Sequence, residues 1–247
     1  MRATHTHYNR IWRLLPCLLL GCLGLSSLAA AEPAAEAAQL DTLRLQVAGL
    51  ERRVQRLRDV EAIEILISAY GYSLDKALWD QVTDLFSENG SIEISQRGVY
   101  QGKARILASM DLYGPQGLRQ QYLHNHIQLQ PLITISEDGL MAWSRHRAIS
   151  QLGTFGRDGV LGGGIYENEY VKENGVWKFK KDHVYTTFFS MYEDGFTGGR
   201  PAPKPSEDIP PDLPATETYA AFPDVYLPAF HYRHPVTGRA IGNPVHE

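Results

Sequence analysis

The chain has 247 residues, a formal net charge of −4 at neutral pH and only two cysteines, both within the first 31 residues. A mildly acidic chain that has no basic cluster in its body is poorly suited to binding nucleic acid. Because no cysteine follows residue 31, the rest of the chain excludes disulfides, a thiolate nucleophile and cysteine-ligated zinc. The length suits one domain with appendages.

Residues 1–31 have the pattern of a signal peptide. Three arginines in the first 13 residues precede an apolar run over 14–28, and three alanines follow at 29–31. This order is typical of a segment that directs export and is then removed. We therefore expect a periplasmic protein, whose formal charge falls from −4 to −7 when the three arginines are lost. A second interpretation stays open: Leu19-Leu20-Gly21-Cys22 also fits a bacterial lipoprotein box, which predicts a membrane-anchored protein lipidated at Cys22.

Residues 36–60 are predicted to form a helical coiled-coil extension. Apolar residues recur there at alternating spacings of four and three, which is the seam of a coiled coil. An isolated helix of this length is marginal in water. The seam should therefore pack either on a second copy of the chain, giving a homo-oligomer, or on the protein's own domain. It consists of Leu43, Val47, Leu50, Val54 and Leu57.

Residues 61–192 hold most of the aliphatic and aromatic residues and are predicted to form one α+β domain. An apolar stripe at helical spacing predicts a helix over 60–74, and shorter helices are expected over 78–86 and 103–110. Alternation begins again at Ser91, after the turn signal Asn89-Gly90. Runs bounded by turn residues then predict four antiparallel strands. These are Tyr122–Ile135, Met141–Leu152, Ile165–Lys172 and Trp177–Phe189.

Residues 197–247 form a Pro-rich arm that contains ten of the chain's 14 prolines. The same segment carries five aromatic residues, which disordered tails usually lack. We therefore expect the arm to lie extended over the domain or over a neighbouring subunit, where it buries rings and acts as a lid on a pocket. A partly ordered surface arm is the alternative.

The stretch Tyr122–Gln130 is the most informative for function. Strand alternation places His124, His126, Gln128 and Gln130 on one face and Asn125, Ile127 and Leu129 on the other. A row of imidazoles and amides backed by aliphatic residues suits the wall of a ligand pocket. Histidines there exchange protons near neutral pH. The plainer alternative is a half-exposed strand whose polar face meets water.

These residues, together with several short motifs, give the chain a resemblance to a known family. The motifs are Leu74-Asp75 followed by Trp79-Asp80, Tyr100-Gln101-Gly102-Lys103, and the strand–turn–strand from Tyr170 to Phe179. Over about residues 58–192 the chain resembles a SnoaL-like domain of the nuclear-transport-factor-2-like superfamily, which includes scytalone dehydratase and lyases of aromatic catabolism. The resemblance implies a cone-shaped, curved antiparallel sheet with helices packed on its concave face, and assembly into dimers or trimers.

The resemblance also implies a cofactor-independent lyase that acts on a small aromatic hydroxylated substrate. Asp75 matches the family's catalytic aspartate and His124 its first histidine. The family's second histidine falls near Ser150, so this chain departs from the pattern, and His126 or His146 is the replacement that we expect. Its serine and asparagine fall at Gly164 and Tyr166. Contacts to the substrate are expected from Tyr70, Tyr166, Gln128 and Trp143.

Other interpretations of the same residues remain open. Asp75 also suits a helix cap, His146 a structural histidine, and Tyr70 a core position. A metal site would use His124, His126 and His146 with Glu167 or Glu169, but glutamines stand where a further ligand is expected, so we expect no metal. The competing class of function is a non-catalytic periplasmic module that binds a small molecule or a partner.

Overall fold

The computed structural model describes residues 20–242, with side chains from residue 35 onward. The chain divides into two compact units, Met1–Gln55 and Arg56–Glu247. The basic start of the predicted signal peptide and Cys17 lie outside the described residues, as does the side chain of Cys22. Export, lipidation and the predicted segment boundaries therefore stay predictions.

Helix α1 (Leu20–Asp75) begins in the first unit, where the predicted seam is exposed to solvent. Four of its apolar side chains are between 45% and 57% exposed: Leu43, Val47, Leu50 and Val54. The predicted helix is confirmed, and a partner for the seam stays a prediction. Among residues 20–242, no helix combines the length and the apolar run that crossing a bilayer requires.

In the second unit, α1 buries the predicted stripe, which includes Ile63, Tyr70 and Leu74. The helix ends because Ala77 adopts a left-handed conformation (φ 51°) and the backbone N–H of Leu78 donates to the carbonyl of Ser73 (3.0 Å). This is the usual hydrogen-bond pattern of a helix C-terminus. It leaves Asp75 as the last helical residue.

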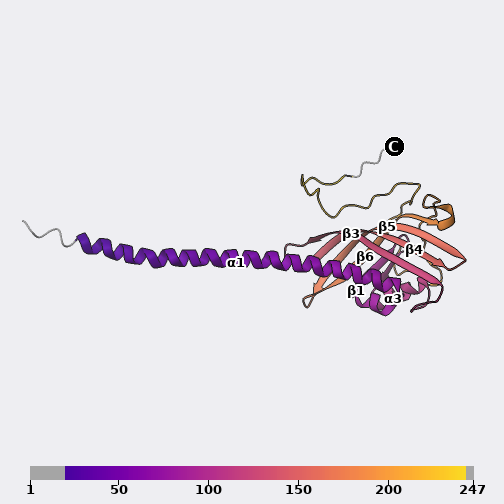
Figure 1. The fold of residues 1–247 in the computed structure, drawn as a ribbon, viewed down its shortest axis with the longest axis horizontal. Coiled ribbons are helices and arrows are strands. Elements are labelled where there is room, and N and C mark those ends of the chain that lie inside the picture. Colours follow the sequence, from indigo (N-terminus) through magenta and orange to yellow (C-terminus); the bar gives the residue numbers. More distant parts are fainter. Residues whose placement is uncertain (1–19, 243–247) are drawn as a thin grey trace, which may run out of the picture. The chain divides into compact units, whose positions relative to one another are not determined.

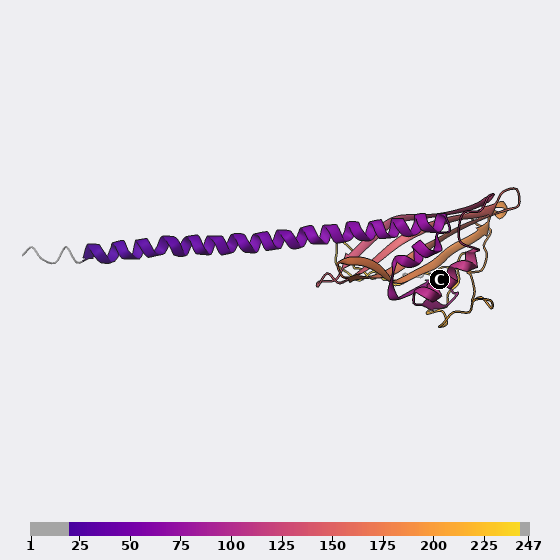
Figure 2. The same cartoon turned by 90° about the horizontal axis from the view of Figure 1, so that it is seen from below.

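The strands within the described part of the chain form one six-stranded sheet in the order β2-β1-β6-β5-β4-β3 (Figures 1 and 2). Neighbours are antiparallel except β1 and β6, which run parallel. The expected purely antiparallel sheet is therefore wrong, and the sheet is mixed. The chain crosses through α3 from one edge to the other, and the meander that follows brings β6 beside β1 in the same direction. The elements are α2 (Trp79–Asp84), β1 (Phe86–Ile94), β2 (Val99–Gln101), α3 (Lys103–Met110), η1 (Asp111–Tyr113), β3 (Tyr122–Ile135), β4 (Met141–Thr154), β5 (Asp158–Glu173), β6 (Val176–Met191) and η2 (Tyr192–Asp194).

The core lies between the helices and one face of the sheet, which we call the inner face. Rings from α1, α2 and four strands meet there, and the largest are almost fully buried. Burying such rings contributes strongly to stability, about 25 cal/mol for each Å² of apolar surface. The rings include Tyr70, Trp79, Phe86, Tyr166 and Phe179.

A β-bulge in β6 decides which side chains reach this inner face. Tyr170 pairs with Phe179, but Glu169 pairs with Lys181, so Lys180 is an extra residue on β6. The extra residue shifts the alternation by one. As a result Asp182 faces inward, and the next residue, His183, faces outward.

The C-terminal segment (residues 197–242) lies along the opposite face of the sheet, which we call the outer face (Figure 1). It also caps the edge strand β2, because Val99 forms an isolated antiparallel bridge with Leu213. The backbone N–H of Gln101 donates to the Asp212 carboxylate at 2.9 Å. The segment is therefore joined to the domain by backbone as well as side-chain hydrogen bonds.

Candidate active site

A cavity of about 280 Å³ opens on the inner face between the end of α1, the β1–β2 turn and strands β3 to β6. Its volume lies near the lower end of the range for small-molecule sites, about 300–1,000 Å³. The wall is mostly apolar and includes six tyrosine and phenylalanine rings, with two histidines and one arginine among its polar residues. The rings come from Tyr70, Tyr113, Tyr122, Tyr166, Phe188 and Phe189.

His126 lies between two hydroxyl groups that line this cavity. Its Nδ1 is 2.7 Å from the Ser150 hydroxyl, and its Nε2 is 2.9 Å from the Tyr166 hydroxyl. Burial, with a smaller effect of His124, lowers the pKa of His126 to about 3. The imidazole is therefore neutral at pH 7, with one nitrogen donating and the other accepting.

His124 lies two residues before His126 on β3, on the same face of the strand, and also lines the cavity. Its ring packs against those of Trp79 (6.2 Å between centroids) and Tyr113 (5.7 Å). No other group in the described part of the chain bonds its buried Nδ1. Burial lowers the pKa of His124, and the nearby Asp75 carboxylate partly offsets this effect.

Asp75 reaches the site from the end of α1. Its Oδ1 accepts a hydrogen bond from the backbone N–H of His126 at 2.5 Å, so the carboxylate fixes β3 to the helix. The sequence expectation of an Asp75–His124 pair stays a prediction. Asp75 raises the pKa of His124, but the hydrogen bond that it makes is to the backbone of the next histidine along that face.

Behind this wall lies a buried acid that the sequence reasoning did not select. Asp182 has no exposed surface and accepts hydrogen bonds from the Tyr70 hydroxyl (3.0 Å) and the Asn168 amide (2.7 Å). Burial raises the pKa of Asp182 to about 7, although both donors oppose the shift. Asp182 thus reaches the cavity through Tyr70, which lines it.

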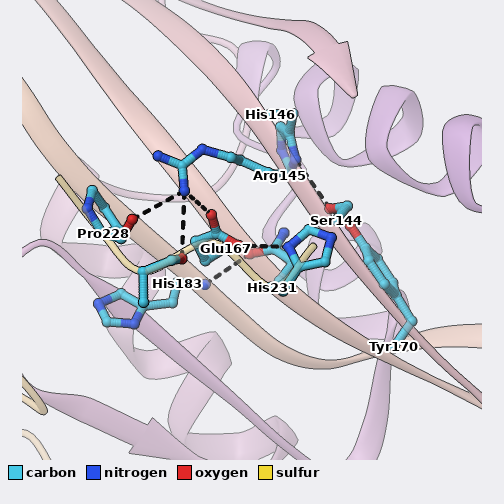
Figure 3. A network of polar contacts seen from close by, with 10 residues as sticks. Ser144, Arg145, His146, Glu167, Tyr170, His183, Pro228 and His231 are labelled. Carbon is cyan, nitrogen blue, oxygen red and sulfur yellow. Dashed lines mark hydrogen bonds and ion pairs between the residues drawn. The ribbon is translucent and has the colours of Figure 1, made fainter. Parts of the chain in front are cut away.

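His146, the expected second proton carrier, lies behind Tyr166 and is only 2% exposed. The two rings stack at 4.7 Å with an interplanar angle of 2°. The Ser144 hydroxyl lies 3.2 Å from Nδ1 of His146 and 2.7 Å from the Tyr170 hydroxyl (Figure 3). Burial lowers the pKa of His146 to about 3. It is thus a neutral support for Tyr166, and the cavity wall does not include it.

The two remaining predicted contacts lie elsewhere. Gln128 faces inward but packs against Gly71 of α1, and its buried amide bonds no other group among residues 35–242. Trp143 alternates with the inward-facing Ala142 and Ser144, so it lies on the outer face. The wall of this cavity does not include Trp143, and a contact between Trp143 and a substrate stays a prediction.

The outer face carries a second polar cluster, beneath the C-terminal segment (Figure 3). Arg145 pairs with Glu167, and Glu167 also lies 2.8 Å from Nδ1 of His231. Arg145 donates to the carbonyl of Pro228 and lies over the Phe230 ring, 3.9 Å from its centroid. The cluster therefore attaches the C-terminal segment to the sheet.

The structure does not bring the residues of the alternative metal ligand set together. Glu167 and Glu169 alternate with the inward-facing Tyr166, so they cannot join the inner-face histidines in one ligand set. Within residues 35–242, no group of three or more histidines and carboxylates is placed to hold a metal ion.

The glycines at 162–164 of β5 allow close contact with β6 beside the cavity. A Cβ on Gly163 would lie 2.3 Å from Cε1 of Phe188, and one on Gly164 would lie 2.8 Å from the carbonyl oxygen of Tyr185. Glycine, which has no side chain, permits this close approach between neighbouring strands.

A curved sheet with helices on one face and a cavity between them defines the class of nuclear-transport-factor-2-like α+β proteins. Residues 55–183 match the family model described as a SnoaL-like domain, and the chain belongs to this family.

Solved structures support the same fold. A protein from Novosphingobium aromaticivorans named as a scytalone dehydratase is 20% identical, with a TM-score of 0.52, and the match covers 63% of this chain and 97% of that one. A type 2 hexachlorocyclohexane dehydrochlorinase, LinA, is also 20% identical, with a TM-score of 0.50, over 56% of this chain and 92% of that one. At this level of identity the likeness establishes the fold.

Proposed function

We propose that the protein is a cofactor-independent lyase that eliminates a group from a small aromatic hydroxylated molecule by acid–base catalysis. One observation carries this proposal: a neutral His126 lies between two cavity hydroxyls, and a second histidine lies on the same wall with an unbonded nitrogen. Membership of the SnoaL-like family supports it. The names of two structural neighbours, a dehydratase and a dehydrochlorinase, both denote eliminations.

The cavity wall supports an aromatic substrate. Its volume of about 280 Å³ suits one ring with a short side chain. Aromatic rings on the wall offer faces and edges against which a substrate ring stacks. The hydroxyls of Tyr166 and Ser150 offer hydrogen bonds to its oxygen atoms.

His124 is the proposed base. Its lowered pKa keeps the imidazole neutral at pH 7, so it can accept a proton from a substrate carbon. Once it is protonated, the negative charge of Asp75 stabilises the imidazolium. A positioned acid or base of this kind contributes roughly 10²–10⁴-fold to the rate.

Tyr166 is the proposed donor to the leaving group. If Ser150 donates to Nδ1 of His126, then Nε2–H donates to the Tyr166 oxygen, and the tyrosine keeps its own hydrogen to donate. Such a chain of hydrogen bonds strengthens the last donor. As the C–O bond breaks, Tyr166 stabilises the charge on the leaving oxygen. His124 then delivers the carbon-derived proton to that oxygen and returns to its neutral form.

The test is turnover of a panel of hydroxylated phenylpropanoids and polycyclic phenols, followed by ultraviolet absorbance with and without a chelator. Wild type should generate new conjugated absorbance that a chelator does not change. His124→Ala and Tyr166→Phe should each lower kcat by about 10²-fold or more. The exposed His234, changed to Ala, is the matched control and should keep full activity. Saturable binding without turnover, unchanged in all variants, would make the protein a binding module.

We also propose that the protein is exported and assembles through its N-terminal helix. The exposed apolar seam supports assembly, because such a stripe gains stability from packing on a second copy. Export rests on the pattern of residues 1–31, and lipidation at Cys22 remains its alternative.

A further inference from the structure

One charged side chain of the cavity wall has no role in the proposed chemistry. Arg97 comes from the turn between β1 and β2 and lines the cavity. Its guanidinium lies over the Tyr113 ring, with Cζ 4.9 Å from the ring centroid. Its Nη1 is buried and bonds no other group in the described chain.

An unpaired buried nitrogen of this kind is unusual for arginine. Two other partly buried arginines of the domain pair with carboxylates, Arg105 with Asp212 and Arg145 with Glu167, whereas Arg119 donates to the Tyr113 carbonyl and has a buried, unbonded Nε. A guanidinium is charged at every physiological pH and presents a planar fork that fits a carboxylate. Leaving a buried donor unbonded costs free energy that a bound anion would recover.

The turn that carries Arg97 is held in place by the C-terminal segment. Gln96 donates to the carbonyl of Tyr219 at 2.6 Å, and the Ser95 hydroxyl lies 3.1 Å from the Tyr219 hydroxyl. Gly98 has φ +93°, and a Cβ there would lie 2.6 Å from both the Leu213 carbonyl oxygen and Cγ of Pro211. The backbone on both sides of Arg97 is therefore fixed before any ligand arrives, which lowers the cost of binding.

Arg97 and the proposed base share one neighbouring ring, that of Tyr113. The centroid of the Tyr113 ring lies 4.9 Å from Cζ of Arg97 and 5.7 Å from the centroid of the His124 ring. Both side chains line the same small cavity, so one molecule can meet them together.

We propose that Arg97 binds the carboxylate of an aromatic acid, and that this defines the substrate class of the cavity. The ligand has one aromatic ring, held by the ring-lined wall, and a short side chain that ends in a carboxylate at Arg97. Calling this ligand a substrate rests on the proposed function. Binding of the anion itself does not require turnover.

The test compares 4-hydroxycinnamate with 4-hydroxycinnamamide by titration calorimetry on the purified full chain. The two probes have nearly the same shape and differ in charge, and both are already unsaturated, so neither offers a leaving group. Wild type should bind the acid at least about tenfold more tightly than the amide, which corresponds to about 1.4 kcal/mol. Arg97→Gln should bring this ratio close to one, while Arg97→Lys, which keeps the charge without the fork, should keep part of it.

Arg147→Gln is the matched control. It removes the same charge from the exposed outer side of β4 and should leave the ratio at its wild-type value. Equal binding of the two probes to wild type, an unchanged ratio in a folded Arg97→Gln, or no binding of either probe would overturn the proposal. Charge-dependent binding in a protein without turnover would refute the lyase and keep the anion site, whereas turnover without a charge preference would do the reverse.

Discussion

Replacing Asp182 with asparagine should change how stability depends on pH. In the folded protein, burial raises the pKa of this carboxyl from 3.8 to about 7. The folded state therefore holds the proton more tightly than the unfolded state does. The stability that Asp182 contributes is fully present below pH 3.8 and is lost as the pH rises through 7. An asparagine does not titrate, so the variant lacks this dependence.

The size of the effect follows from the two pKa values. Between pH 5 and pH 8 there are about two pH units over which the carboxyl is protonated in the folded state and ionised in the unfolded state. Each of these units changes the free energy of unfolding by about 1.36 kcal/mol. The free energy of unfolding of wild type should therefore fall by about 2.5 kcal/mol relative to Asp182→Asn. At pH 5 the variant should be the less stable protein by about 1 kcal/mol, because an amide cannot reproduce both hydrogen bonds, from Tyr70 and Asn168.

The assay is urea unfolding at 25 °C and at pH 5 and 8, followed by the fluorescence of the buried Trp79 and Trp177. Other titrating groups, His126 and His146 among them, affect wild type and variant alike and cancel in the difference. The exposed Asp224, changed to Asn, is the control, and its stability relative to wild type should be the same at pH 5 and pH 8. If the difference between wild type and Asp182→Asn is the same at both pH values, burial does not hold the proton on this carboxyl.

Three further substitutions test other features. Glu93→Ala removes the carboxylate that accepts two hydrogen bonds of 2.8 Å from Thr216, so proteinase K should cut the C-terminal segment faster. Gly163→Ala places a Cβ against the ring of Phe188, and urea unfolding should show a loss of about 1–3 kcal/mol. Leu50→Lys puts a charge into the exposed seam, and sedimentation velocity should show a smaller assembly than wild type forms.

Each of these has a matched control. Glu207→Ala alters an exposed acid of the same segment and should leave the cleavage rate unchanged. A Cβ on Gly242 meets nothing within 4 Å, so Gly242→Ala should leave the unfolding midpoint unchanged. Leu45→Lys changes a side chain that is 74% exposed and lies off the seam, and should not alter the assembly. Equal effects of control and test variant would refute the corresponding assignment.

The alternation of β3 made His124 and His126 predictable, because a regular strand places every second side chain on one face. The same rule assigns the wrong side chains of β6 to the inner face. Read without a bulge, alternation from Phe179 predicts an inward Lys181 and His183, whereas the extra residue Lys180 turns Asp182 inward instead. No local sequence signal marks that bulge, since its cause is the pairing with β5.

Residues outside regular elements were the least predictable. Arg97 lies in a turn, where no periodicity indicates the direction of a side chain. Its position depends on hydrogen bonds to a segment more than 100 residues away in the sequence, such as that between Gln96 and Tyr219. Such long-range pairing comes from packing and leaves no trace in a window of sequence.

The capped edge of the sheet has a consequence for solubility. An exposed edge strand offers unpaired backbone groups to other chains and is a common start of aggregation. In β2 these groups are already engaged: Val99 donates to and accepts from Leu213, and the N–H of Gln101 is bound by Asp212. A chain that stops before residue 209 would leave this edge open, so the C-terminal segment also protects the domain from strand-to-strand association.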